Sequence, residues 1–593
     1  PQVIERVVTP TPVPPTAVPP TKAAAATDTI VLSMQQEPDT LHPLIGSMMA
    51  RTIANGFIRV GCLARNEKLE YVALGCETVP TLENGGAKLV GAGADQHLEV
   101  TYKIRKDWRW TDGTPVTSPD VLLWWKLQMD PDMETPGRDA EEKIFDIKVT
   151  DDKTVTVIYL SENQVKQAIA GTLKGNVAFD KFKDDYKDAY GDYLTGALKG
   201  PVVDPLYPVI IDWFPNHVLG KVAAKDQAKS DYAKKPLGDG AYELKEWKSG
   251  QELDYVASSK PFPLGDPKIK NIILRIIPDS NAEIAALQKG EVDLATQIGL
   301  TVNNSPELDK LVGYKPIYLP SFTWEHLDIN LDKDIFKDVR VRQAMLTAID
   351  RKSISDKVYF GKNTVADSYV SNIHWAYADS VTKYPYDKAK AQQLLKDAGW
   401  DCKSTPCTKK DGDKTMKLEF EYVTTDRADR QSVAQVIQAQ LKSVGFGVNL
   451  KFLYGRGLFA TASAGGPLSA RTFDVGEYAW VFGADPDPTG TYTCNGIPKK
   501  ENSFSGQNYP GYCNKDFDSL AAKESKDLET ALSQDKRKPV FKAIQEMFTK
   551  DLPALPIYNY ANVFVIRTGM TGFKPLPTSQ PESWNAWEWT LSK

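Results

Sequence analysis

The chain has 593 residues, of which 41% are hydrophobic and 25% charged, and its formal net charge is −5. This length exceeds the size at which one hydrophobic core keeps growing, so two to four domains are expected. No basic block of the kind that binds nucleic acid and no run of 18 apolar residues is present. The composition therefore predicts a soluble globular protein without a nucleic-acid partner or a membrane-spanning helix.

The N-terminal region is rich in proline. In TPTPVPPTAVPPT (residues 9–21), six of thirteen residues are proline and none is charged. Such segments form extended polyproline II spacers. We therefore predict that residues 1–27 are a tether, and we expect a lipidated N-terminus upstream of this sequence to anchor it to a membrane. The alternative is a disordered tail without a function.

Six cysteines form three pairs that are close in sequence. Each pair would close a short local loop, which favours three disulfides and a location outside the cytoplasm. Unrelated buried thiols are the alternative, and metal binding is disfavoured because no CxxC or neighbouring histidine accompanies any pair. The pairs are Cys62 with Cys76, Cys402 with Cys407, and Cys494 with Cys513.

The first third of the chain after the tether alternates strands with one strong helix signal. A strand is predicted to begin at TIVLSM, and residues 97–110 alternate apolar and polar side chains as in a half-buried strand. Residues 117–129 are predicted to form a helix, with Thr117 and Asp120 as a capping box. Residues 148–160 are typical of a β-hairpin, so this region is expected to be rich in antiparallel strands.

Later segments are typical of α/β structure. Helices are predicted after Asp279 or Ser280, within 336–361 with a break near Asp350, and before Gly399. Residues 417–453 form the clearest unit: a strand, a helix that ends at Gly445, and a second strand. Such a βαβ unit builds parallel sheet, so the part after about residue 320 is predicted to be α/β.

Catalytic and cofactor motifs are missing from the sequence. No phosphate-binding loop, HExxH or GxSxG is present, and the five histidines have no ligand spacing. We therefore expect no catalytic residue, no metal and no cofactor. A secreted hydrolase stays an alternative, because the carboxylate pair of a glycosidase needs no local motif.

Aromatic side chains are concentrated in three segments that we expect to be irregular: residues 321–330, 476–494 and 508–513. Aromatic rings beside Asp, Asn and Gly are typical of a ligand pocket. The alternative is that these rings belong to the core.

The order of several motifs resembles one known family. The relevant stretches are QQEPDTLHPL (35–44), YKIRKDWRWTDGTPVTSPDVLLWW (102–125), LGDGAYELKEWKSGQELDYVAS (237–258) and LDINLDKDIFKDVRVRQAMLTAIDRKSI (327–354). Together they are similar to the extracytoplasmic solute-binding proteins of ABC importers, in the peptide/nickel-binding class of oligopeptide- and dipeptide-binding proteins.

The resemblance implies an α/β, two-lobed periplasmic-binding-protein fold (type II, large class) with an extra α+β domain inserted in lobe I. The implied lobe I is discontinuous, and it combines 28–60, 213–320 and 556–593. The extra domain would be 61–212 and lobe II 321–555.

The resemblance also implies ligand-binding positions in the cleft between the lobes. Asp485, with Asp487 as a close rival, matches the acidic residue that holds the α-amino group of a peptide. The other matching positions are Ser47, Met48 and Met49 in lobe I, and Trp324, His326, Trp480, Phe482 and Ala484 in lobe II.

The implied function is capture of a solute and its delivery to a membrane permease that a separate ATPase drives. Peptides are the leading ligand, paired as an added strand, and oligosaccharides are the alternative. The resemblance predicts no enzymatic activity, an extracytoplasmic location and a monomer.

Overall fold

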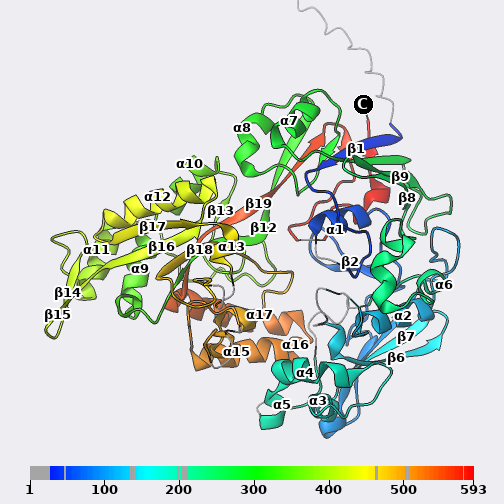
Figure 1. Ribbon diagram of the computed structural model, residues 1–593, viewed down its shortest axis with the longest axis horizontal. Helices are drawn as coiled ribbons and strands as arrows, with labels where there is room; N and C mark the ends of the chain where they lie inside the picture. Colours follow the sequence, from blue (N-terminus) through cyan, green and yellow to red (C-terminus); the bar gives the residue numbers. More distant parts are fainter. Residues whose placement is uncertain are drawn as a thin grey trace, which may run out of the picture.

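The computed structural model describes residues 27–592, apart from 46–47, 134, 136–137, 139, 197–198, 204–210, 461, 463–464, 501–503, 505 and 579. The predicted tether therefore lies outside the described residues, except for Thr27. Two bodies of mixed α/β structure lie on either side of two long strands, β12 (Tyr314–Ile329) and β19 (Ala554–Arg567) (Figure 1). We name the body that contains β1 lobe I and the body that contains β16 to β18 lobe II.

One sheet runs through both lobes, because β12 and β19 belong to each of them. Their outer halves pair from Tyr314 with Arg567 to Pro320 with Ala561, and their inner halves pair from Trp324 with Asn559 to Asp328 with Ala554. On the lobe II side the sheet continues through β18 (Val475–Val481), β16 (Glu419–Thr425) and β17 (Gly447–Leu453). On the lobe I side it continues through β11 (Leu294–Ala295), β1 (Thr29–Met34), β10 (Asn271–Ile276), β9 (Glu252–Ala257) and β8 (Tyr242–Lys248), while β13 (Thr364–Val365) pairs with β19.

The pairing of β12 with β19 shifts register between Pro320 and Trp324. Between the pair Pro320–Ala561 and the pair Trp324–Asn559, β12 advances four residues while β19 advances two. The bulge in β12 therefore contains two extra residues. A bulge bends a strand and redirects its side chains. Residues 321–323 therefore leave the regular ladder where the sheet passes from lobe I to lobe II.

Lobe I contains a second, antiparallel sheet in the order β4 (Ala87–Val90), β5 (His97–Lys103), β7 (Thr154–Tyr159) and β6 (Ile144–Asp151). The alternation predicted for 97–110 is confirmed over β5, whose Leu98, Val100 and Tyr102 are fully buried. The predicted hairpin is the β6–β7 pair. The predicted capping box of Thr117 and Asp120 begins α2 (Ser118–Gln128).

Lobe II contains the predicted βαβ unit. Strands β16 and β17 pair in parallel, and α12 (Ala428–Lys442) connects them with Val433, Ile437 and Leu441 buried. After the helix Gly445 adopts φ +116°, and a Cβ atom there would lie 2.1 Å from the sulfur of Cys407. Only glycine fits this turn, for both conformational and steric reasons.

The remaining elements are helices and three short hairpins. The hairpins are β2 (Leu63–Arg65) with β3 (Tyr71–Ala73), β14 (Thr408–Asp411) with β15 (Lys414–Lys417), and β20 (Met570–Thr571) with β21 (Thr590–Leu591). The remaining helices before β12 are α1 (Met49–Asn55), α3 (Glu162–Ile169), α4 (Lys183–Tyr190), α5 (Asp192–Thr195), α6 (Asn216–Leu219), α7 (Ser280–Gln288) and α8 (Ser305–Leu308). Those after β12 are α9 (Val339–Ala348), α10 (Arg351–Val358), α11 (Lys388–Asp397), α13 (Gly455–Leu458), α14 (Thr489–Tyr492), α15 (Lys515–Lys526), α16 (Leu528–Ala531) and α17 (Gln534–Asp551).

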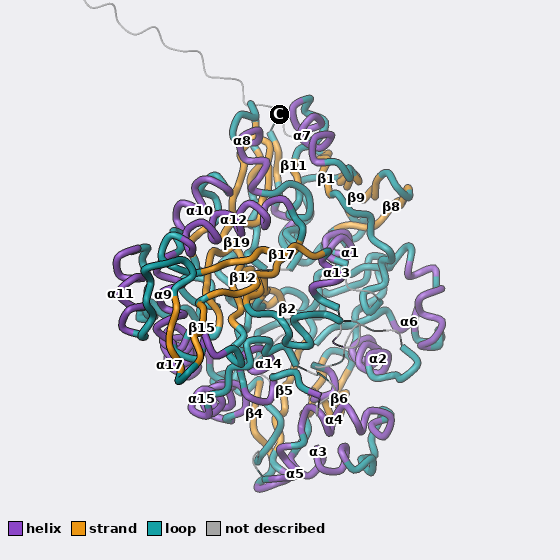
Figure 2. Tube along the Cα trace, turned by 60° about the vertical axis from the view of Figure 1, so that its left-hand side comes forward, coloured by secondary structure: helices purple, strands orange, loops and turns teal. Residues whose placement is uncertain are grey.

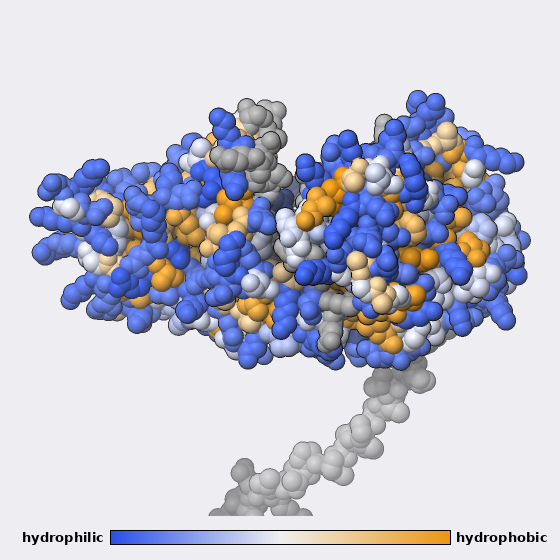
Figure 3. All heavy atoms as spheres, turned by 90° about the horizontal axis from the view of Figure 1, so that it is seen from below, coloured by the Kyte–Doolittle hydropathy of each residue, from blue (hydrophilic) through white to orange (hydrophobic). Residues whose placement is uncertain are grey.

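The lobes meet at a second place besides the shared strands. Helices α15 and α17 lie at the same end of the molecule as α3, α4 and α5 (Figure 1, Figure 2). Ala531, the last residue of α16, and Leu532 after it belong to the hydrophobic cluster of lobe I. Polar residues cover most of the face seen from below, on both lobes (Figure 3).

The hydrophobic clusters do not follow the sequence ranges predicted for the two lobes at every point. Ile284 and Leu287 of α7 and Leu308 of α8 pack in the cluster of lobe II, although they lie within the range 213–320 assigned to lobe I. The boundaries between lobes and extra domain stay predictions. Within the described residues, no helix is both long and apolar enough to cross a bilayer.

All six cysteines are disulfide-bonded, and the pairs are the three that lie close in sequence: Cys62–Cys76, Cys402–Cys407 and Cys494–Cys513. The longest loop, between Cys494 and Cys513, spans 19 residues. Closing a loop of this length stabilises a fold by about 3 kcal/mol in the chain-entropy account.

We predict that the unreduced, denatured protein incorporates no alkylating reagent, whereas the reduced protein incorporates six equivalents, because every thiol is bonded. Intact-protein mass spectrometry measures the difference. Labelled cysteines in the unreduced sample would contradict the three bonds.

Candidate functional site

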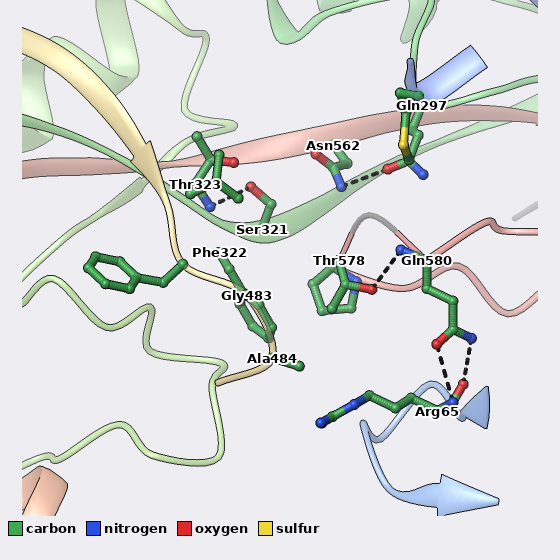
Figure 4. Close-up of a pocket in the computed structure, with 14 residues that line it drawn as sticks. Arg65, Gln297, Ser321, Phe322, Thr323, Gly483, Ala484, Asn562, Thr578 and Gln580 are labelled. Atoms are coloured by element: carbon green, nitrogen blue, oxygen red, sulfur yellow. Dashed lines mark hydrogen bonds between the residues drawn. The ribbon is translucent and has the colours of Figure 1, made fainter. Parts of the chain in front are cut away.

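A cavity of about 460 Å³ lies beside the bulge in β12. It lies within the size range of small-molecule sites. Both lobes contribute to its wall, so it is a cleft between them (Figure 4). The lining residues are Met49, Arg65, Gln297, Ser321, Phe322, Thr323, Val481, Phe482, Gly483, Ala484, Asn562, Pro577, Thr578 and Gln580.

Amide and hydroxyl groups in this wall are held by hydrogen bonds to one another. The Asn562 amide donates to Gln297 Oε1 at 3.2 Å, and the Gln297 amide donates to Glu582 Oε2 at 3.1 Å. Ser321 Oγ accepts from the backbone N–H of Thr323 at 3.2 Å. These bonds fix the directions of the polar groups that a ligand meets, and so preorganise the wall.

A second cavity of about 340 Å³ adjoins the first, with Arg65 and Ala484 lining both. Its wall contains Asp485, whose two oxygens each accept a 2.7 Å bond from the guanidinium of Arg537. Arg537 also donates to Glu524 Oε2 at 2.5 Å. Burial raises the pKa of Glu524 to about 9, against the opposing effect of Arg537. Arg537 thus contacts two carboxyl groups, of which only Asp485 lines the cavity.

A third cavity of about 270 Å³ lies on the other side and shares Gln297, Thr323 and Asn562 with the first. Arg427 and Asp429, which form an ion pair at 2.6 Å, line it. The first cavity therefore adjoins both of the others, and the three follow the seam between the lobes.

The structure brings some of the predicted ligand-binding residues to these cavities. Met49 and Phe482 line the first, Asp485 the second, and Ala484 both. The Ala484 carbonyl accepts a 2.8 Å bond from the indole of Trp375. Ser47 lies outside the described residues.

Other predicted residues are elsewhere. Met48 is the N-cap of α1 and packs on the lobe I core, and Trp480 stacks on Tyr509 with ring centroids 6.2 Å apart. Asp487 is exposed, and its carboxylate accepts from the backbone N–H of Thr489 at 2.8 Å. None of these three lines the cavities described above.

Trp324 and His326 are core residues rather than cavity residues. Both are completely buried, and their rings stack with centroids 4.3 Å apart. They lie in β12 beyond the bulge, and residues 321–329, expected to be irregular, are strand. Trp324 and His326 point into the lobe II core. The cavity is lined instead by the neighbouring residues of the bulge, Ser321, Phe322 and Thr323.

Sequence reasoning missed most of the polar wall. Gln297, Asn562 and the pair Thr578 and Gln580 come from three separate parts of lobe I and carry no local motif. Arg65 is the last residue of the short strand β2, and nothing in the sequence distinguishes it from other basic residues. Among the described residues, no group of three or more His, Cys, Asp or Glu side chains could hold a metal ion.

The profile of a family described as bacterial extracellular solute-binding proteins, family 5, middle part, matches residues 93–502. The chain belongs to this family. The oligopeptide-binding protein AppA of Bacillus subtilis (strain 168) is 25% identical over 569 residues, which cover 95% of this chain and 92% of that protein.

Solved structures have the same fold. The structure of AppA from Bacillus subtilis in complex with a nonapeptide has a TM-score of 0.63 at 22% identity, and covers 96% of this chain and 100% of that chain. The ABC transporter substrate-binding protein CtaP of Listeria monocytogenes has a TM-score of 0.71 at 20% identity, with the same coverage. The α/β, two-lobed type II periplasmic-binding-protein fold and the expected family are thereby confirmed.

Glu582, behind Gln297, gives the site a testable pH dependence. Its side chain is 1% exposed, and burial raises its pKa to about 7. The folded state therefore holds a proton that the unfolded chain, with a pKa near about 4.3, releases earlier. We predict that the free energy of unfolding falls between about pH 4.5 and 7, by up to about 1.4 kcal/mol per pH unit from this group.

Glu582→Gln, which mimics the protonated acid, should remove this part of the slope. Urea unfolding of both proteins at pH 5, 6 and 7 measures it. Parallel curves for the two proteins would contradict the raised pKa.

Proposed function

We propose that this chain captures a peptide in the cleft between its lobes and delivers it intact to the permease of an ABC importer. Membership of the solute-binding family and similarity to an oligopeptide-binding protein support this function. A peptide carries an N–H and a C=O at every residue, and the first cavity supplies amides, hydroxyls and backbone for them.

The segment after β18 is the main structural observation that supports the proposal. Val481 is the last residue of β18 that pairs with β12, and Phe482 and Gly483 line the cavity beyond it. In the described part of the chain their backbone groups form no backbone–backbone hydrogen bond. An extended peptide can therefore add to this segment as a strand, with its own N–H and C=O groups as partners.

Closure of the lobes gives the mechanism. The strands β12 and β19 join the lobes, and the cavity takes residues from both, so a bound peptide contacts the two walls together only when they approach. A ligand favours the closed state by these additional contacts alone.

We infer a location outside the cytoplasm, supported by the family and the three disulfides. A lipid anchor, a spacer role of the proline-rich segment and a monomeric state complete the proposal.

Ligand recovery tests the function directly. Purified protein is denatured, and the released small molecules are identified by mass spectrometry. We expect peptides, and we expect small-angle scattering to show compaction when a recovered peptide is added to ligand-free protein. Recovery of oligosaccharides alone, or of a chemically altered peptide, would contradict the proposal.

Asp485 is the proposed anchor for the α-ammonium group of the peptide. A carboxylate accepts more than two hydrogen bonds, so Asp485 can bind an ammonium group while it is paired with Arg537. We predict that Asp485→Asn weakens binding of a recovered peptide about tenfold, as expected for loss of a charge-assisted bond. N-acetylation of the peptide should weaken binding to wild type but not to the variant.

Asp487→Asn is the matched control. This carboxylate is two residues away, is exposed and lines none of the described cavities, so calorimetry should give wild-type affinity. Equal losses in both variants would contradict a specific role for Asp485.

A further inference from the structure

The guanidinium of Arg65 is the charged group of the first cavity. The side chain extends from β2 toward Ala484 of lobe II (Figure 4). Arg65 is 9% exposed, and every other residue of that wall is uncharged. A positive charge in an otherwise neutral and partly apolar cleft determines which ligand groups can bind there.

Arg65 has few partners for its five N–H donors. It donates to Tyr71 Oη at 2.5 Å and to the Leu69 carbonyl at 3.4 Å, and its guanidinium lies 4.3 Å from the centroid of the Tyr71 ring. Within the described residues it forms no ion pair with an Asp or Glu. Asp485 acts on Arg65 electrostatically, but its two oxygens bond to Arg537.

The other well-buried guanidinium groups in the part of the chain that the structure describes are compensated. Arg342 lacks a carboxylate but donates to the carbonyl oxygens of Phe336, Asp551 and Leu552. Four others have a carboxylate partner: Arg59 with Asp212, Arg351 with Asp367, Arg430 with Glu325, and Arg537 with Asp485. Arg65 has neither a carboxylate nor more than one carbonyl acceptor among the described residues. Because burial of a charge without a counter-charge is costly, this exception indicates that a carboxylate is supplied from outside the chain.

Contacts hold both the backbone and the guanidinium of Arg65 in place. The backbone N–H of Arg65 donates to Gln580 Oε1 at 3.2 Å, and the Gln580 amide donates to the Arg65 carbonyl at 2.9 Å. The ring and hydroxyl of Tyr71 hold the guanidinium itself. Little conformational entropy is then lost when a ligand binds.

We propose that Arg65 binds a carboxylate group of the ligand in the first cavity. This inference rests on the proposed peptide function and adds a specificity: a terminal carboxylate or an acidic side chain lies at this point. The planar guanidinium matches a carboxylate with two parallel bonds, and burial strengthens them. Because Arg65 belongs to lobe I and Ala484 to lobe II, the bond forms at the seam and favours the closed state.

The test uses three pairs of synthetic probes in calorimetry. Tri-leucine is compared with its C-terminal amide, and the amide of Leu-Glu-Leu with the amide of Leu-Gln-Leu; N-acetyl tri-leucine and its amide repeat the first comparison without the amine. Wild type should prefer the acid in at least one comparison by about 10- to 100-fold. A preference in the first pair identifies the terminal carboxylate, and one in the second identifies a side chain.

Arg65→Gln should abolish the preference for the acid and leave unchanged the affinity for the probe of each pair that lacks the carboxylate. Arg65→Lys, which keeps the charge without the planar fork, should retain part of it. The ratio of the affinities for the acid and for the amide does not depend on how much either substitution destabilises the fold. Arg340→Gln is the control, because Arg340 is paired with Asp338 and lines none of the described cavities, and it should keep the wild-type ratio.

Two failures are distinguishable. Peptides that bind wild type with no preference for an acid, or a preference that survives in Arg65→Gln, would overturn the role of Arg65 while peptide capture stands. If none of the probes binds wild type and no peptide is recovered from the purified protein, the peptide function is overturned together with this inference.

Discussion

The antiparallel pairing of β12 with β19 is the constraint on which the rest of the structure depends. Each strand forms part of the sheet in both lobes, so the ladder between them fixes how one lobe lies against the other. The two extra residues of β12 interrupt the ladder where the lobes join. The interruption turns residues 321–323 into the cleft. One irregularity in the ladder thus marks the junction between the lobes and forms part of the cavity wall.

The arginine side chains of the cleft differ in whether a carboxylate pairs with them. Arg537 and Asp485 neutralise each other in the second cavity, and Arg427 and Asp429 do so in the third. Between them, Arg65 keeps its charge without a carboxylate among the described residues. A ligand with an acidic group therefore gains most at the centre of the seam, where its binding also joins the lobes. Selectivity and closure then have the same physical cause.

Local signals in the sequence predicted local structure well. The alternation in β5, the capping box of Thr117 and the stop at Gly445 each depend on neighbouring residues only, and all three are as expected. The resemblance supplied the family and the fold. The cavity wall was harder, because it depends on the register of β12 against β19, strands more than 200 residues apart. Nothing within SFTWEHLDIN indicates that Ser321 and Thr323 face the cleft while Trp324 and His326 face the core.

The aromatic residues that suggested stacking on a ligand have another use. Trp324, His326 and Tyr478 pack ring against ring, with centroid distances of 4.3 and 4.5 Å, and hold β12 against β18. These rings pack β12 against β18, and the segment that follows β18 lines the cleft. The wall itself is left to amides, hydroxyls and backbone, which bind features common to all peptides. The aromatic core thus supports recognition indirectly: it positions the groups that bind, and a single guanidinium supplies the discrimination.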